Sequence, residues 1–239
     1  MYYIRKRAKY RPVNDLRITT TDCLFDDRMT SYYVAYLKRK KSESTSVSER
    51  SLIAKYICGY NMLCNTHWKN VDEVLFPMNM KKQKHWILGR LVFKERCIYV
   101  YNSMNSNVAR KSAVEAATKY SVLIPLFLAQ MNFYDLRSDI DLNSQPYLNK
   151  NSNEAFRIEV VEDLPTQKES DCGAFLLAFA EFLCLRKEIP CDFNIENYRE
   201  RVAFLLFRYG NMKIESNIVS DEEVEKEVPN PKRKGKNKI

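Results

Sequence analysis

The stretch Gln167-Lys-Glu-Ser-Asp171-Cys172-Gly173-Ala-Phe175 leads directly into an apolar run that continues to Leu183. A run that is apolar on nearly every face predicts a buried helix. The free N–H groups and the dipole at the N-terminus of such a helix favour negative charge, so they favour the thiolate of a cysteine placed there. Buried cysteines without any chemistry are also common, and a reactive Cys172 therefore requires a nearby base.

The chain offers two candidate bases, His67 and His85. His67 lies in a polar stretch without clear periodicity, whereas His85 begins a strand-like segment over 85–92. A second strand-like segment over 97–102 follows after a short polar turn. Pairing the two segments as a hairpin places Asn102 directly across from His85. A side chain in that position fixes the tautomer and the orientation of an imidazole ring.

A cysteine hydrolase needs one further group, a donor for the negative charge that develops on the attacked carbonyl oxygen. Gln167 lies five residues before Cys172 and is placed to offer its side-chain amide to that oxygen. Each residue alone also has a purely structural interpretation, such as a strand-end turn residue for Asn102. Together they favour Cys172 as nucleophile, His85 as base, Asn102 as its orienting partner and Gln167 as oxyanion donor.

These residues resemble the signature of the ubiquitin-like-specific proteases, the Ulp/SENP family of cysteine peptidases. That signature has a His-Trp pair, a strand ending in Tyr-Asp-Ser, and Gln-x(n)-Asp-Cys-Gly-x-Phe; the corresponding parts here are His85-Trp86, Tyr101-Asn102-Ser103 and Gln167 to Phe175. The segment from Leu24 to Tyr33 is similar to the family's Trp-Leu-Asn-Asp segment. The resemblance extends from about Leu24 to a helix ending near Tyr209, and divergent plant members look similar to the chain.

The resemblance implies an α+β fold of the papain-like type, with a central mixed β-sheet flanked by helices. It implies a thiol protease that cleaves after the C-terminal di-glycine of a ubiquitin-like modifier, with SUMO first, in deconjugation, precursor processing or both. Cys172, His85 and Gln167 then act as nucleophile, general base and oxyanion donor. Trp86 covers the channel that holds the di-glycine, and Asp27 contacts the body of the modifier.

Three positions depart from the family pattern. Asn102 stands where the family has Asp, and it supports an imidazolium less well because it carries no charge. Leu24 stands in place of a channel tryptophan, and Gln167 is one residue nearer the cysteine than in relatives. Two alternatives therefore stay open: a catalytically impaired member that binds a modifier, and a Cys-His acyltransferase.

Composition limits the remaining possibilities. The 239 residues, 45% of them apolar, fit one protease domain over 22–212, preceded by a basic arm over 1–21 and followed by a charged tail over 213–239 that we expect to be disordered. The seven cysteines are irregularly spaced and only two histidines are present, so we expect no metal and no cofactor. We find no apolar signal core and no stretch of membrane-spanning length. We expect a monomer in the nucleus or cytoplasm, whose net charge of +9 allows only non-specific contact with nucleic acid.

Apolar spacing and turn residues also predict the elements around the site. Helices are expected over 27–41, 48–63, 108–120 and 195–209, the second begun by a capping box of Ser46 and Glu49 and the last stopped by Gly210. A polar loop is expected over 143–154 and a strand over 156–161.

Overall fold

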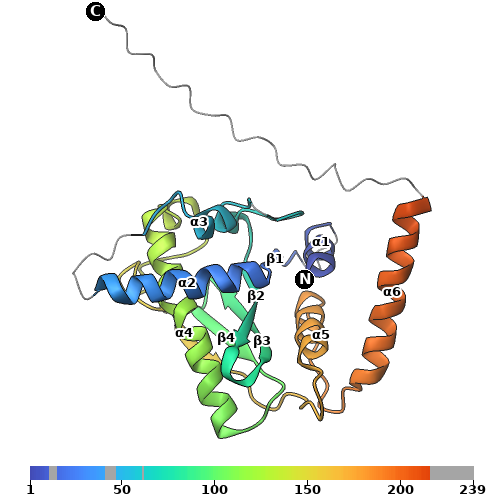
Figure 1. Cartoon of the computed structure of the whole chain (residues 1–239). Coiled ribbons are helices and arrows are strands. Elements are labelled where there is room, and N and C mark those ends of the chain that lie inside the picture. The colour runs from blue at the N-terminus through green and yellow to red at the C-terminus, as the bar shows by residue number, and fades with distance from the viewer. Residues whose placement is uncertain (11–14, 41–46, 61, 216–239) are drawn as a thin grey trace, which may run out of the picture.

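A computed structural model describes residues 1–10, 15–40, 47–60 and 62–215. Its centre is a mixed sheet in the order β1-β2-β3-β4-β5, formed by Ile18–Thr20, Glu73–Met80, His85–Val92, Cys97–Tyr101 and Arg157–Val160. The outer pairs β1–β2 and β4–β5 are parallel, and the inner pairs β2–β3 and β3–β4 are antiparallel. Helices cover both faces (Figure 1), so the predicted α+β fold is confirmed.

The helices are α1 (Tyr2–Tyr10), α2 (Cys23–Lys40), α3 (Leu52–Ile57), α4 (Asn107–Gln130), α5 (Cys172–Cys184) and α6 (Ile195–Glu215). Short 3-10 helices form at Trp68–Asn70, Lys81–Gln83 and Tyr134–Leu136.

The two faces of the sheet are buried in two hydrophobic clusters. One lies among α2, α3, α4 and the sheet and contains Phe25, Phe76 and Tyr120. The other lies among α1, α5 and the opposite face and contains Leu88 and Phe179. Because neighbouring side chains of a strand point to opposite faces, β3 contributes to both clusters. Its apolar residues therefore anchor the hairpin that begins at His85.

A buried ion pair joins α2 to α4. The carboxylate of Asp26 is 0% exposed and lies 2.6 Å from Nζ of Lys119 and 2.6 Å from the hydroxyl of Tyr120. The neighbouring Asp27 faces solvent. The two consecutive carboxylates therefore have different roles, and the buried one fixes the position of α2 against the sheet.

Helix α4 continues through Pro125, although helix was predicted only as far as residue 120. Proline lacks the N–H that would bond to the carbonyl of the residue four positions earlier. Here that carbonyl, on Ser121, accepts the N–H of Phe156 at 3.0 Å, and the Ser121 hydroxyl donates to the Phe156 carbonyl at 2.5 Å. The strand-like segment at 156 thus replaces the bond lost in the helix, and α4 remains unbroken.

The length and apolar composition of α4 would let it cross a membrane, which corrects the expectation that no stretch reaches that length. Much of its apolar surface is buried inside the protein, including Ala113, Ala117 and Leu123. A core helix of a globular domain meets the same criteria, so the length alone is weak evidence for a membrane span.

Two other predicted helices have different limits. Helix α3 covers only Leu52–Ile57. Ser51 caps its first turn by accepting the N–H of Ala54 at 3.2 Å, so the helix begins later than predicted; Ser46 of the expected capping box lies outside the described residues. Helix α6 continues through Gly210 to Glu215, so the predicted stop is wrong. The Tyr209 ring packs edge-on against Tyr3 of α1, and tertiary contacts of this kind override the weak helix propensity of one glycine.

The N-terminal segment, predicted as a basic arm, contains helix α1, which packs against β1 and α5. Ile4, Arg5 and Ala8 are buried, and Nε of Arg5 donates to the Leu63 carbonyl at 2.7 Å. The basic composition of the segment gives no indication of this buried helix face. The expected charged tail lies outside the described residues from 216 onward.

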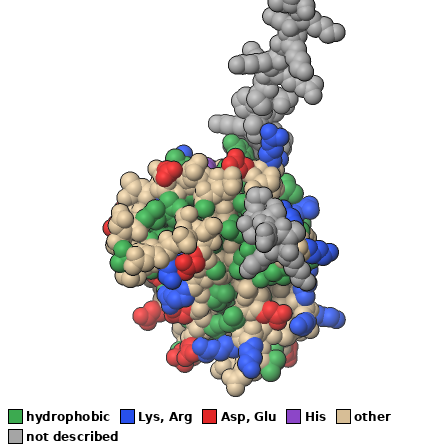
Figure 2. Space-filling model, turned by 90° about the vertical axis from the view of Figure 1, so that its left-hand side faces the viewer, with side chains coloured by type: hydrophobic (Ala, Val, Ile, Leu, Met, Phe, Trp, Pro, Cys, Tyr) green, Lys and Arg blue, Asp and Glu red, His purple; other side chains and the backbone are tan. Residues whose placement is uncertain are grey.

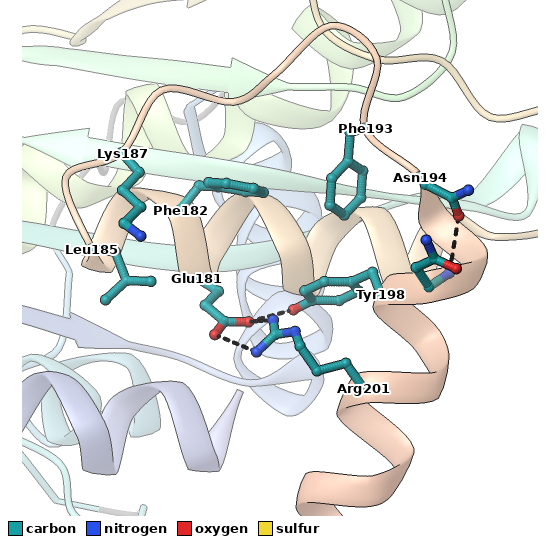
Figure 3. A pocket seen from close by; sticks show the side chains of 9 residues that line it. Glu181, Phe182, Leu185, Lys187, Phe193, Asn194, Tyr198 and Arg201 are labelled. Atoms are coloured by element: carbon teal, nitrogen blue, oxygen red, sulfur yellow. Dashed lines mark hydrogen bonds and ion pairs between the residues drawn. The ribbon is translucent and has the colours of Figure 1, made fainter.

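Helix α6 is held against α5 by a carboxylate with several donors (Figure 3). Glu181 accepts hydrogen bonds from Arg201 at 2.6 Å, from the Tyr198 hydroxyl at 3.0 Å and from Arg7 at 3.2 Å. Burial raises the pKa of Glu181, but the Arg201 and Tyr198 hydrogen bonds outweigh it and the net pKa is lowered. The ionised carboxylate thus joins α1, α5 and α6.

The surface carries charges of both signs. Figure 2 shows Lys and Arg side chains interspersed with Asp and Glu on one side of the molecule, with apolar side chains between them. On the coloured part of that side, basic side chains do not form a continuous surface. Proteins bind phosphate backbones through continuous basic surfaces.

Candidate active site

His85 and Asn102 meet at one end of the central hairpin. Nε2 of His85 lies 2.8 Å from Oδ1 of Asn102, and both side chains are buried. The predicted direct pairing of these residues is wrong, because β3 and β4 pair Leu88 with Tyr101, which shifts the register by two residues. A two-residue shift keeps every side chain on its face, so the two residues become diagonal neighbours that still hydrogen-bond.

The turn between the strands sets their register. Val92 pairs with Cys97, so residues 93–96 form the turn, and Arg96 adopts a left-handed conformation with φ 51°. Nη2 of Arg96 donates to the Glu154 carbonyl at 2.8 Å. This contact with a distant loop fixes the turn over 93–96, the residues that the sequence placed between the two strands. The turn was predicted correctly, and only the pairing of His85 with Asn102 across the strands was wrong.

A backbone group sets the orientation of the Asn102 amide. The N–H of Met104 donates to Oδ1 of Asn102 at 3.0 Å, so the oxygen is the atom that faces His85. The histidine must then donate from Nε2, which leaves Nδ1 free to accept a proton. Nδ2 of Asn102 is buried and, among the described residues, has no hydrogen-bond partner.

The surroundings of His85 favour its neutral form. Its side chain is 2% exposed, and burial lowers its pKa, although the hydrogen bond with Asn102 acts in the opposite direction. A neutral imidazole with a free Nδ1 is the form that a general base requires.

This lowered pKa predicts a pH-dependent contribution to stability. Below about pH 6.5, the usual histidine pKa, the unfolded chain binds a proton at His85 more readily than the folded chain does. The free energy of unfolding should therefore fall more steeply from pH 7 to pH 5 in the parent protein than in His85→Gln. Urea unfolding across this range measures both slopes. His67, whose pKa burial also lowers, remains in both proteins, and equal slopes would contradict the expectation.

Cys172 is the first residue of α5, as predicted, and its side chain is half-buried. The preceding Asp171 does not cap the helix with its side chain; its carboxylate instead lies 2.9 Å from Nη1 of Arg199 on α6. Helix α5 packs against β3, the strand that begins with His85. In the described part of the chain no hydrogen bond joins the Cys172 thiol to His85. Catalytic hydrogen bonds often tighten only when substrate binds.

The other cysteines differ from Cys172 in their surroundings. Cys23, Cys58, Cys97, Cys172, Cys184 and Cys191 are free thiols. Burial raises the pKa of Cys184 to about 12 and also raises the pKa values of Cys58 and Cys97. These three therefore behave as packing residues. Cys23 and Cys191 are exposed.

Gln167 is hydrogen-bonded to Ser103, the residue that follows Asn102. Its backbone N–H donates to the Ser103 carbonyl at 2.9 Å, and its Oε1 accepts the Ser103 hydroxyl at 3.0 Å. The His85–Asn102 pair and the Ser103–Gln167 pair therefore lie next to each other in the chain just after β4, joined by the peptide bond between Asn102 and Ser103. The sequence had given no role to Ser103.

The two predicted substrate-contacting residues lie elsewhere on the molecule. Trp86 is half-buried and packs with the cluster that contains Leu88 and Phe179, on the face of β3 opposite His85. Asp27 lies exposed in the first part of α2, near Leu24, which is 59% exposed.

Two cavities open elsewhere on the described surface. A cavity of about 370 Å³ between α5 and α6 is lined by Glu181, Phe182, Phe193 and Arg201, among others, and is shown in Figure 3. Another of about 650 Å³ is lined by Arg90, Tyr99, Arg110 and their neighbours. None of the six predicted site residues lines either cavity. The predicted catalytic residues therefore lie outside both cavities.

Comparisons with solved structures find SUMO proteases at low sequence identity. Solved structures with a similar chain path include the SUMO protease Ulp1 with its catalytic cysteine oxidised to a sulfinic acid, which is 15% identical over 82% of this chain and 68% of that chain, with a TM-score of 0.43. The C-terminal Ulp1 protease domain in complex with Smt3, the yeast ortholog of SUMO, is 16% identical over 82% and 68%, with a TM-score of 0.44. The Ulp1-like SUMO protease catalytic domain of Chaetomium thermophilum is 16% identical over 83% and 65%, with a TM-score of 0.40.

A search of curated proteins finds no significant match. The sequence profile of the Ulp1 protease family, C-terminal catalytic domain, matches residues 24–213, which is most of the chain and includes every predicted site residue. The chain therefore belongs to the Ulp1 family of cysteine peptidases and carries its catalytic domain.

Proposed function

We propose that this protein is a thiol protease that cleaves after the C-terminal di-glycine of a ubiquitin-like modifier, and that the modifier is SUMO. The observation that carries the proposal is the buried His85–Asn102 hydrogen bond of 2.8 Å, which leaves Nδ1 of the histidine free. Membership in the Ulp1 family supports the choice of modifier. Both deconjugation and precursor processing use the same chemistry.

The residues divide the reaction between them. Neutral His85 first takes the Cys172 thiol proton at Nδ1. The resulting thiolate attacks the carbonyl carbon after the di-glycine and forms a C–S bond, while the Gln167 side-chain amide and the Cys172 backbone N–H donate to the oxyanion. Protonated His85 gives its Nδ1 proton to the leaving lysine amine as the C–N bond breaks. Water then loses a proton to His85 and attacks the thioester, and the thiolate leaves.

Two residues outside this group bind the substrate in the proposal. Trp86 covers the channel for the di-glycine, where a flat ring excludes side chains larger than glycine. Asp27, exposed on α2, contacts the body of the modifier through its charge. A reducing compartment, the nucleus or cytoplasm, suits such an enzyme because its nucleophile must remain a free thiol.

We further propose that Asn102 makes the reaction slower than an aspartate would. A carboxylate stabilises the imidazolium that forms during the reaction, and a neutral amide does so less strongly. The Asn102 amide still fixes the tautomer of His85, because its oxygen accepts the Nε2 proton.

A panel of covalent probes tests both points. Each probe is one ubiquitin-like modifier with a thiol-reactive group at its C-terminus. The SUMO probe should label the parent protein and leave Cys172→Ala unlabelled, and Asn102→Asp should react faster. Labelling by a different modifier alone would overturn the choice of SUMO, and labelling by none would overturn the protease assignment.

A further inference from the structure

We propose that Ser103 is a positioning residue of the oxyanion site, because its hydroxyl orients the Gln167 carboxamide so that the NH2 group faces the developing negative charge. This inference rests on the proposed protease function and specifies how its oxyanion donor is held in place.

Ser103 contacts Gln167 through both its backbone and its side chain. The Ser103 hydroxyl donates to Oε1 of Gln167 at 3.0 Å, and the Ser103 carbonyl accepts the Gln167 N–H at 2.9 Å. The serine is 2% exposed, so water does not compete for its hydroxyl. The two residues are 64 positions apart, and the contact fixes the loop before Cys172 to the end of β4.

The chemistry of a carboxamide makes its orientation decisive. Its oxygen only accepts hydrogen bonds and its NH2 group only donates them. Rotation by half a turn would present the oxygen to the oxyanion, and the two negative atoms would repel. The Ser103 hydroxyl donates to the Gln167 side-chain oxygen, so the NH2 group remains available to donate to the oxyanion.

The contact also reduces the freedom of a long side chain. A free glutamine loses considerable rotamer entropy when it is fixed, and an oxyanion donor is effective to the extent that it is fixed before the reaction. Ser103 fixes the Gln167 side chain before the substrate binds. Its effect should therefore appear in the chemical step and not in substrate binding.

The neighbouring Asn102 extends the same arrangement to the base. Oδ1 of Asn102 accepts from Met104 N–H and from His85, while the next residue, Ser103, holds Gln167. Two consecutive residues at the end of β4 thus set the positions of the base and of the oxyanion donor relative to each other.

Cleavage of a SUMO C-terminal fusion by four proteins tests the inference: the parent, Ser103→Ala, Ser103→Thr and Gln167→Ala. Ser103→Ala should lower kcat by about 10- to 100-fold with KM unchanged, which is less than the roughly 10²–10³-fold that loss of an oxyanion donor itself costs. Ser103→Thr keeps the hydroxyl and should keep most of the activity. Thermal unfolding of each variant confirms that it is folded.

A double variant identifies the partner through which Ser103 acts. Once Gln167→Ala has removed the carboxamide, adding Ser103→Ala should cause little further loss, because nothing remains to be oriented. An undiminished further loss, or an unchanged kcat in Ser103→Ala alone, would overturn the inference. The double-variant comparison tests the inference even if Ser103→Thr does not fold. An inactive parent protein would instead refute the protease function itself.

Discussion

Cys172→Ala is expected to abolish cleavage of a SUMO C-terminal fusion, with a fall in kcat of at least about 10³-fold. The substitution removes the atom that forms the covalent intermediate, and the oxyanion donors and bound substrate alone leave only a small residual rate. A gel-based or fluorescence assay of fusion cleavage under saturating substrate measures kcat directly.

The exposed thiols Cys23 and Cys191 provide matched controls. Cys23→Ala and Cys191→Ala each remove a solvent-accessible thiol without touching the proposed site, so both should retain the activity of the parent. Cleavage that survives in Cys172→Ala, or that disappears in Cys191→Ala, would assign the nucleophile to another residue.

Asp26→Ala should lower the free energy of unfolding by about 3–5 kcal/mol. The Asp26 carboxylate is 0% exposed, and its removal leaves Lys119, whose side chain is 9% exposed, without its charged partner at 2.6 Å. The Tyr120 hydroxyl also loses its shorter hydrogen bond and keeps only the Pro77 carbonyl at 3.4 Å. Denaturant unfolding followed by circular dichroism measures the change.

The adjacent Asp27→Ala is the matched control, because Asp27 carries the same charge on the same helix and is exposed. Its effect on the free energy of unfolding should stay within about 0.5 kcal/mol, and the loss of the proposed contact should weaken binding of the modifier. Adding Lys119→Met to Asp26→Ala should recover part of the lost stability, since no unpaired charge then remains buried. Equal destabilisation by Asp26→Ala and Asp27→Ala would contradict the account of α2.

The elements with strong local patterns were predictable from the sequence. The unbroken apolar run after Cys172 fixes α5, and the two segments around residues 85–92 and 97–102 give the central hairpin. The contact between His85 and Asn102 was also predicted, and it survived an error of two residues in register because such an error does not change the face of the sheet.

The elements that depend on distant contacts were not predictable. Strand β2 lies between β1 and β3 and is buried along almost its whole length, so it shows no alternation of apolar and polar residues. Helix α1 looks like a basic arm because its buried face, with Ile4 and Ala8, is visible only against β1 and α5. Ser103 contacts Gln167 across 64 positions, and no sequence pattern indicates that hydrogen bond.

Peptide mapping by mass spectrometry after reaction with the SUMO-based thiol probe tests the central claim most directly. If Cys172 is the nucleophile and His85 its base, the parent protein should carry one adduct, on Cys172, and His85→Ala should carry almost none in the same time. An adduct on Cys23 or Cys191, or equal labelling of Cys172 with and without His85, would contradict the account.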